Sequence, residues 1–169
     1  MRPTPCPPAL PPGHENGQTW RTLMSLAFDE ACRAAAEGET PVGAALISAD
    51  GELLARAHNN TISLNDPTAH AEVLCLREAG ARLSNYRLTG SILAVTLEPC
   101  IMCLGALLHA RVAGIVFAAP DPKAGALVSN LDGANLPFSN HRPWVLQGVM
   151  AEDCGAVLKR FFLARRKPF

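Results

Sequence analysis

The sequence contains no long apolar run, no export signal and no net charge. None of its apolar stretches approaches the ~18 residues that a membrane helix needs, so we expect no membrane contact. Met1 and Arg2 lead into prolines instead of the apolar core of a signal peptide, so we expect a cytoplasmic protein. Lys and Arg together number 15, as do Asp and Glu, so the net charge does not point to a nucleic-acid partner.

Acidic residues are absent after Asp153. The basic residues that follow it are Lys159, Arg160, Arg165, Arg166 and Lys167. Cations near the C-terminal end of a helix interact favourably with the helix dipole. Taken alone, this basic run favours a solvated face on a C-terminal helix.

The chain has six cysteines, which without an export signal indicate free thiols or metal ligands rather than disulfides. Cys100 and Cys103 have the spacing of a ligand pair. Cys6 lies in the N-terminal segment. At the other three positions, which are apolar positions of expected helices, we expect small buried hydrophobic side chains: Cys32, Cys75 and Cys154.

Prolines are concentrated in residues 1–18, which we interpret as a disordered tail outside the fold. The remaining residues 19–169 suit one domain, since a chain of this size buries roughly two-thirds of its unfolded surface. Hydrophobic residues make up 49% of the sequence and charged residues 18%, which is typical of a globular body.

The hydrophobic pattern after residue 19 alternates between helical and strand-like periods. We expect helices at 20–37, 66–79, 99–111 and 151–167, with Asp66 as the N-cap and Pro67 as the first residue of the second. We expect strands at 42–48, 52–58, 91–97, 114–118 and 144–148, the first two joined by a two-residue turn at Asp50-Gly51. The irregular segment 119–142 is long enough to be functional. The order predicts a three-layer α/β/α sandwich with a five-stranded mixed sheet.

Two short motifs carry the chemistry. The first is D-P-T-A-H-A-E at 66–72, with His70 and Glu72, and the second is E-P-C-I-M-C at 98–103, with Cys100 and Cys103. One imidazole and two thiolates would leave the fourth position of a tetrahedral zinc open to water. Glu72, which is not needed as a ligand, could then carry protons. H-x-E…P-C-x-x-C is an established signature of zinc-dependent nucleobase deaminases.

One geometric question and one alternative remain open at this point. Residues two apart on a regular helix point ~200° from each other, so His70 and Glu72 share a site only if the first turn is distorted or the ring reaches back. The alternative is a closed structural zinc site with Cys75 or Cys32 as the fourth ligand, or a zinc-stabilised binding module without catalysis. Glu72 has no duty in such a site.

Longer matches extend these motifs. They are P-V-G-A at 41–44, N-Y-R-L at 85–88, T-L-E-P-C-I-M-C-L-G-A-L at 96–107, D-P-K-A-G-A at 121–126, N-H-R at 140–142 and F-F-x-x-R-R at 161–166. Together with D-P-T-A-H-A-E they resemble the bacterial tRNA-specific adenosine deaminase family over roughly residues 20–167. The resemblance implies a cytidine-deaminase-like fold, a homodimer, one Zn²⁺ per subunit, and hydrolysis of the wobble adenosine in a tRNA anticodon to inosine.

The resemblance also implies residue roles. His70, Cys100 and Cys103 would hold zinc, and Glu72 would be the proton shuttle. The expected substrate contacts are Asn59 to the purine, the Ala71 backbone N–H to the base edge, Asp121 and Lys123 beside the flanking anticodon nucleotides, and Phe161, Phe162, Arg165 and Arg166 against the anticodon loop. With this resemblance, we interpret the C-terminal basic run as an RNA-binding surface and not only as a solvated helix face.

Four positions depart from the family pattern, all in the expected RNA-facing segment: Pro120, Ala124, Leu127 and Val128. They leave open a second activity with the same chemistry, deamination of a free base or nucleoside such as guanine, cytosine or adenosine. Without the resemblance, Asn59 reads as an ordinary turn residue. We expect His58 and His109 to be surface or hydrogen-bonded residues, and His141 either to orient the 119–142 segment or to line the RNA path.

Overall fold

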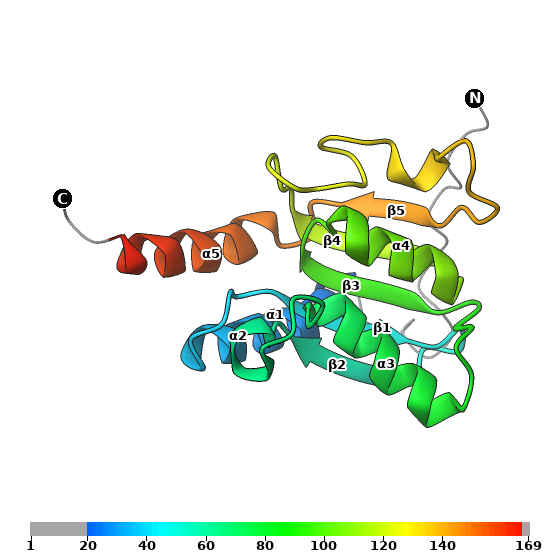
Figure 1. Ribbon diagram of the computed structural model, residues 1–169, viewed down its shortest axis with the longest axis horizontal. Coiled ribbons are helices and arrows are strands. Elements are labelled where there is room, and N and C mark those ends of the chain that lie inside the picture. Colours follow the sequence, from blue (N-terminus) through cyan, green and yellow to red (C-terminus); the bar gives the residue numbers. More distant parts are fainter. Residues whose placement is uncertain (1–19, 167–169) are drawn as a thin grey trace.

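Five strands form one mixed sheet in the order β2-β1-β3-β4-β5 in the computed structural model, which describes residues 20–166 (Figure 1). The strands are β1 Gly43–Ile47, β2 Leu53–His58, β3 Ile92–Leu97, β4 Gly114–Ala119 and β5 Trp144–Gln147. β1 is antiparallel to β2 and β3, whereas β3, β4 and β5 run parallel. The mixed five-stranded sheet is thus confirmed. The expectations for residues 1–18 and for Lys167 lie outside the described residues.

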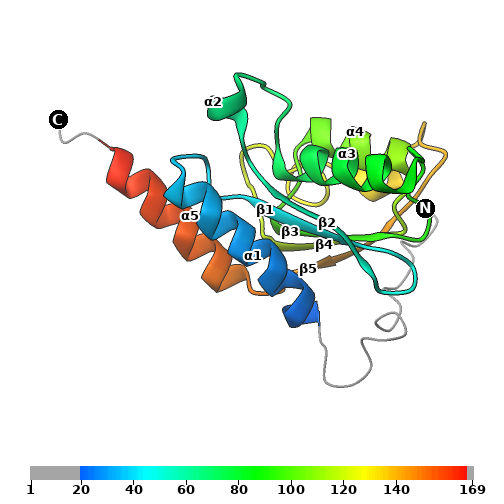
Figure 2. The same cartoon turned by 90° about the horizontal axis from the view of Figure 1, so that it is seen from below.

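Helices cover both faces of the sheet. α1 Trp20–Ala36 and α5 Ala151–Arg165 lie side by side on one face, and α3 Ala71–Leu83 and α4 Ile101–Ala110 lie on the other (Figure 2). Each face has its own apolar core. β1 and β4 are buried at every residue, which is why their sequences read as continuous apolar runs without alternation. The three-layer α/β/α architecture is confirmed.

The turn between β1 and β2 is longer than expected. The Ser48 N–H donates to the Glu52 carbonyl at 2.8 Å, which leaves three residues, Ala49 to Gly51, in the loop. Gly51 has φ of 84°, a left-handed conformation that glycine adopts without steric cost. The register shifts between Leu46 and Ile47, so the expected two-residue turn is wrong by one residue.

Both motif helices begin later than the sequence indicated. The Asp66 carboxylate accepts hydrogen bonds from the Thr68 N–H at 2.8 Å and the Thr68 hydroxyl at 2.7 Å, so Asp-Pro forms a turn instead of a helix start. His70 is the extended N-cap of α3, with φ −77° and ψ 151°. Cys100 is likewise the extended N-cap of α4, with φ −75° and ψ 173°. α3 also continues past Gly80 to Leu83.

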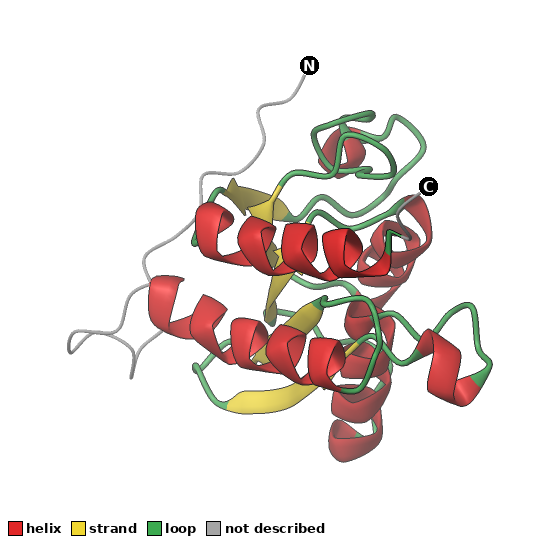
Figure 3. Ribbon diagram, turned by 90° about the vertical axis from the view of Figure 1, so that its left-hand side faces the viewer, coloured by secondary structure: helices red, strands yellow, loops and turns green. Residues whose placement is uncertain are grey.

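Two further elements and one cysteine differ from expectation. The polar stretch after β2 contains a short helix, α2 Thr61–Leu64, and the irregular segment contains a short 3₁₀ turn, η1 Gly133–Asn135, at the top of Figure 3. Cys75 and Cys154 are buried as expected, but Cys32 is exposed because the buried stripe of α1 passes through its neighbour Ala31. None of the described helices is long and apolar enough to cross a membrane.

Candidate metal centre and substrate cavity

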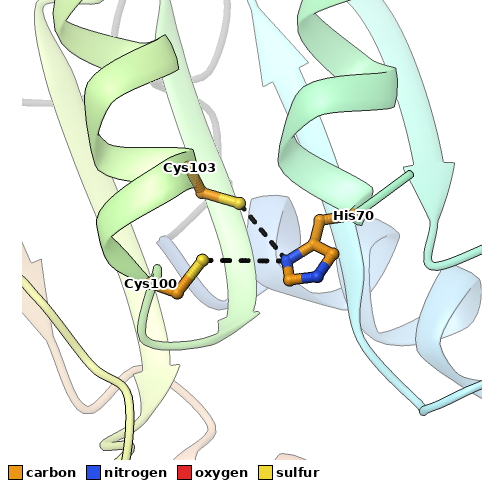
Figure 4. A group of neighbouring side chains, drawn as sticks. All are labelled: His70, Cys100 and Cys103. Carbon is orange, nitrogen blue, oxygen red and sulfur yellow. Dashed lines mark hydrogen bonds between the residues drawn. The ribbon is translucent and has the colours of Figure 1, made fainter. Parts of the chain in front are cut away.

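His70, Cys100 and Cys103 converge at the edge of the sheet where α3 and α4 begin (Figure 4). His70 Nδ1 lies 3.8 Å from Cys100 Sγ and 3.5 Å from Cys103 Sγ. The three ligand atoms lie within 4.8 Å of one another. A tetrahedral zinc with Zn–N of about 2.0 Å and Zn–S of about 2.3 Å sets N and S roughly 3.5 Å apart. The three side chains therefore fit a tetrahedral zinc ion.

The four-ligand alternative finds no support among the described residues. The His70, Cys100 and Cys103 group is the one metal-capable cluster found in residues 20–166. Cys75 is fully buried in the core of α3, where burial raises the pKa of its thiol, and Cys32 is exposed on α1. The cluster therefore offers three candidate ligands, one fewer than a tetrahedral zinc ion takes.

The thiol pair is electrostatically asymmetric. Hydrogen bonds from Cys103 and then from His70 lower the pKa of Cys100 to about 3, despite its partial burial. The hydrogen bond to Cys100 raises the pKa of Cys103, and the bond to Cys100 raises that of His70. Zinc binds the thiolate form, so the lowered pKa of Cys100 is in the direction that suits a metal ligand.

Glu72 is the second residue of α3 and is 3% exposed. Burial raises the pKa of its carboxyl group. Its Oε2 is buried and has no hydrogen-bond partner among the described residues, which is rare for a buried carboxylate oxygen. His70 precedes α3 in extended backbone, so the ~200° rule for positions within a helix does not apply to this pair. Both residues can therefore face the same cavity.

A cavity of about 240 Å³ opens beside the cluster. Its lining brings together Thr40, Val42, Asn59, Thr61, His70, Glu72, Leu97, Glu98, Cys100, Asp121 and Ala124. Pockets for drug-sized ligands usually measure ~300–1,000 Å³. This cavity therefore suits one small group, and the rest of any larger substrate would lie outside it.

Asn59 connects the end of β2 to the start of α3. Its Oδ1 accepts the Ala71 N–H at 2.8 Å, and the residue is buried. The Ala71 N–H is thus engaged within the protein, which differs from the expected contact with a base edge. The group that Asn59 can offer to the cavity is its amide Nδ2.

Glu98 was named in the sequence only as part of the second motif, yet it organises one wall of the cavity. Its Oε1 accepts the N–H groups of Leu127, Val128 and Ser129 at 3.1, 2.8 and 2.9 Å. Its Oε2 accepts the Asp121 N–H at 3.0 Å and the Ser129 hydroxyl. Burial would raise the pKa of Glu98, but these hydrogen bonds outweigh it and lower the pKa. The sequence signal for this role is an acid directly after a mostly apolar strand.

Of the expected substrate residues, Asp121 lines this wall, and Lys123 follows it two residues later in the same turn. Asp121 Oδ1 accepts the N–H groups of Lys123 at 3.0 Å and Ala124 at 3.3 Å, which forms a tight turn. Lys123 is exposed and lies in the chain between the lining residues Asp121 and Ala124. Of the positions that depart from the family pattern, Ala124 lines the cavity, Pro120 and Val128 are exposed, and Leu127 is 2% exposed in the core.

The opposite wall depends on a second buried acid that sequence reasoning missed. Glu39 is fully buried and accepts the N–H groups of Ser63 at 2.8 Å and Ile62 at 3.2 Å, and the Thr61 hydroxyl at 3.4 Å. Burial would raise its pKa, but these hydrogen bonds lower it. Glu39 therefore anchors α2 on one wall of the cavity, and Glu98 anchors residues 121–129 on the other.

The end of α5 lies beside the cavity and not within its lining. The Arg165 guanidinium lies 3.7 Å from the centre of the Phe161 ring and donates to the Gly38 carbonyl at 2.6 Å. Gly38 is two residues before Thr40, which lines the cavity. Phe162 is 51% exposed, with its ring edge-to-face against Phe161, and Arg166 is exposed.

Two histidines have structural partners. His58 bridges Glu30 and Glu37, at 3.0 Å to each carboxylate, which agrees with a hydrogen-bonded histidine. His141 Nε2 lies 2.6 Å from the Val112 carbonyl, so it ties the irregular segment to the body of the protein. Of the two roles expected for His141, the structure supports the orienting one.

Comparisons with known proteins agree with the geometry. The family described as "Cytidine and deoxycytidylate deaminase zinc-binding region" matches residues 18–119. The chain is 43% identical over 145 residues to a tRNA-specific adenosine deaminase from Haemophilus influenzae, covering 86% of this chain and 84% of that protein.

Solved structures extend the likeness. One from a study of A-to-I editing by tRNA:A34 deaminases at the wobble position of transfer RNA has 41% identity and a TM-score of 0.78, covering 80% of this chain and 98% of that one. A guanine deaminase from Bacillus subtilis has 30% identity and a TM-score of 0.60, covering 90% and 99%.

Proposed function

This chain belongs to the zinc-binding cytidine and deoxycytidylate deaminase family and, within it, to the tRNA-specific adenosine deaminases, and on that premise we propose that it hydrolyses the wobble adenosine of a tRNA anticodon to inosine. The observation that carries the chemistry is the three-ligand cluster next to a buried carboxylate oxygen without a partner. The likeness over most of the chain to tRNA-specific relatives supports the substrate.

His70, Cys100 and Cys103 would hold one zinc ion, and Glu72 would remain free to move protons. When bound, zinc polarises a water molecule and lowers its pKa toward ~7. Glu72 Oε2 takes up one proton from the attacking water and delivers it to ring N1, and it then moves the second proton, from the new hydroxyl group, to the leaving amine. The water oxygen bonds to C6, the C6–N6 bond breaks and ammonia leaves, which converts adenosine to inosine.

The walls of the cavity position the substrate. A cavity of about 240 Å³ accepts one base, so the wobble nucleotide must turn out of its stack to enter it. Asn59 Nδ2 would donate to the purine, and Asp121 and Lys123 would lie beside the flanking nucleotides. The rest of the anticodon loop would meet the end of α5, where Phe162 offers a stacking surface and Arg166 a cation.

A homodimer is part of the same proposal. α4 exposes Ile101 at 59%, and the segment beside it exposes Phe138 at 83%. These side chains line one groove together with Gly105, Leu108 and Leu136. Exposed apolar surface of this kind is typical of protein–protein contacts, and a second copy of the chain is its proposed occupant.

A cytoplasmic location belongs to the same proposal, because the proposed substrate is tRNA and translation takes place in the cytoplasm.

Deamination of a free base is the second candidate. The small cavity and the likeness to the guanine deaminase favour it, since neither requires an RNA backbone. It would give no role to the exposed cations at the end of α5.

The deciding experiment compares substrates. Purified zinc-loaded protein is incubated with an anticodon stem-loop carrying wobble adenosine and, separately, with free adenosine, guanine and cytosine. We expect inosine in the stem-loop and far slower conversion of the free compounds. A stem-loop with its adenosine moved away from the wobble position serves as the control. Conversion of any free compound as fast as the stem-loop contradicts the proposed substrate.

A further inference from the structure

The loop 121–129, here called the mouth loop, folds around one buried side chain. Its first residue, Asp121, and its last three residues all donate backbone N–H groups to the Glu98 carboxylate. Glu98 is 2% exposed, and no cation is paired with it among the described residues. The negative charge is therefore balanced by the mouth loop itself, which makes these hydrogen bonds strong.

The mouth loop packs directly on the carboxylate. A Cβ atom at Gly125 would lie 2.3 Å from Glu98 Oε2 and 2.6 Å from the Asp121 carbonyl oxygen, so the close packing of the loop on the carboxylate excludes a side chain at this position. The Ala126 N–H also donates to the Pro99 carbonyl at 2.9 Å, and Gly125 pairs with Cys100 in an isolated bridge. The mouth loop thus contacts each of residues 98, 99 and 100, and the last of these is the proposed metal ligand Cys100.

Glu98 acts on the substrate wall through Asp121. The Asp121 N–H is bound by Glu98 Oε2, and the Asp121 side chain in turn holds the N–H groups of Lys123 and Ala124. Release of Asp121 would loosen the turn that carries the exposed Lys123 between the lining residues Asp121 and Ala124. The metal ligands would keep their places, because Cys100 and Cys103 are fixed by the start of α4.

We propose that Glu98 is a positioning residue for RNA selection, which fixes the mouth loop so that Asp121 and Lys123 meet the nucleotides that flank the target base. This proposal rests on the proposed function, because the selected partner is the anticodon loop. Glu98 does not touch the reacting atoms. Its loss weakens binding of the RNA more than it slows the conversion of RNA already bound.

The test is the Glu98→Gln variant. The new amide oxygen takes the place of Oε1, because three N–H groups donate to that position. The amide NH₂ group then takes the place of Oε2 and faces the Asp121 N–H, so two hydrogen-bond donors oppose each other. We expect KM for the stem-loop to rise about tenfold, the loss typical of one charge-assisted hydrogen bond, with kcat within about threefold. Zinc content stays at that of the wild type, and amide hydrogen exchange of the mouth loop becomes faster.

Two variants accompany it. Ser129→Ala removes only the hydroxyl donor and keeps the loop backbone, so it shows a smaller shift of KM in the same direction in a protein that folds. Glu39→Gln, at the matched carboxylate of the other wall, raises exchange at Ile62 and Ser63 while the mouth loop stays protected.

The outcomes separate cleanly. Unchanged KM, or a fall in kcat with KM unchanged, overturns the positioning role, and so does unchanged exchange of the mouth loop in Glu98→Gln. Loss of zinc from this variant assigns Glu98 to the metal centre instead. If the wild-type protein leaves the stem-loop unconverted, the proposed function fails, whereas the exchange comparison, made on the protein alone, still decides whether Glu98 holds the loop.

Discussion

The metal cluster and the walls of the cavity are built in opposite ways. His70 and Cys100 occupy equivalent positions at the starts of two neighbouring helices, so regular secondary structure sets their distance. One wall is the irregular loop 121–129 and the other is the four-residue helix α2, and each is anchored by a buried carboxylate, Glu98 and Glu39 respectively. On the proposed function, the reacting groups lie at the starts of regular helices and the substrate contacts lie on the cavity walls, an arrangement that would let substrate preference change without disturbing the reaction.

The departures from the family pattern follow this division. Pro120, Ala124 and Val128 lie on or beside the mouth loop, and the two metal motifs are intact. Leu127 differs from them, since its side chain is in the core and its backbone binds Glu98. We therefore expect substitutions in the two regions to separate turnover from substrate preference.

The largest effect is expected for Glu72→Ala. Loss of a general acid–base residue reduces kcat by about 10²–10⁴-fold, and zinc content is retained because Glu72 is not among the three ligands. Inosine formation and metal content are measured on the same preparation. Glu78→Ala, an exposed acid on the same helix, is the control and keeps both. A variant that loses zinc together with activity would make Glu72 a ligand.

A smaller effect, confined to RNA, is expected for Phe162→Ala. Stacking of a base on an aromatic ring is worth ~1–3 kcal/mol, so kcat/KM for the stem-loop falls by about tenfold or more. Any slow conversion of free adenosine stays unchanged, since Phe162 does not line the cavity. Leu163→Ala removes a side chain of similar exposure, 52% against 51%, and is the matched control. Equal losses in both variants would contradict a stacking role.

The smallest effect is expected for His58, the residue directly before Asn59. Burial lowers the pKa of His58, but the hydrogen bonds and charges of Glu30 and Glu37 outweigh it and raise the pKa. Arg33 and Arg56 also pair with Glu30, which limits the rise in the pKa of His58. A raised folded-state pKa means that the stabilisation is full below the ordinary value near 6.5 and is lost as the pH rises through the raised pKa.

The measurement is urea unfolding of the wild type and His58→Gln at several pH values. We expect the wild type to exceed the variant by roughly 1 kcal/mol more at pH ~6 than at pH ~9, with activity on the stem-loop altered little. A difference between the two proteins that grows with rising pH would contradict the raised pKa.

The architecture and the three metal-capable residues were accessible from the sequence, because periodicity and motif spacing are local signals. The start of α3 was not, since Asp-Pro suits a helix start and a turn equally well, and the hydrogen bonds of Asp66 to Thr68 select the turn. This choice also answers how His70 and Glu72 can share a cavity.

The roles of Glu98 and Glu39 could not be read from local patterns. Glu98 binds donors 23 to 31 residues away, and Glu39 binds donors 22 to 24 residues away. Such partners are brought together only by the tertiary fold. The engagement of the Ala71 N–H by Asn59, 12 residues earlier, is hidden for the same reason.

We expect one zinc ion bound by three protein ligands, with its fourth coordination position taken by water. X-ray absorption at the zinc edge of the purified protein tests it directly, because sulfur and nitrogen or oxygen ligands give separate distances. We predict two sulfurs at about 2.3 Å and two lighter ligands at about 2.0–2.1 Å, one of them His70. Three sulfurs would mean that another cysteine closes the site, which would contradict an open catalytic zinc.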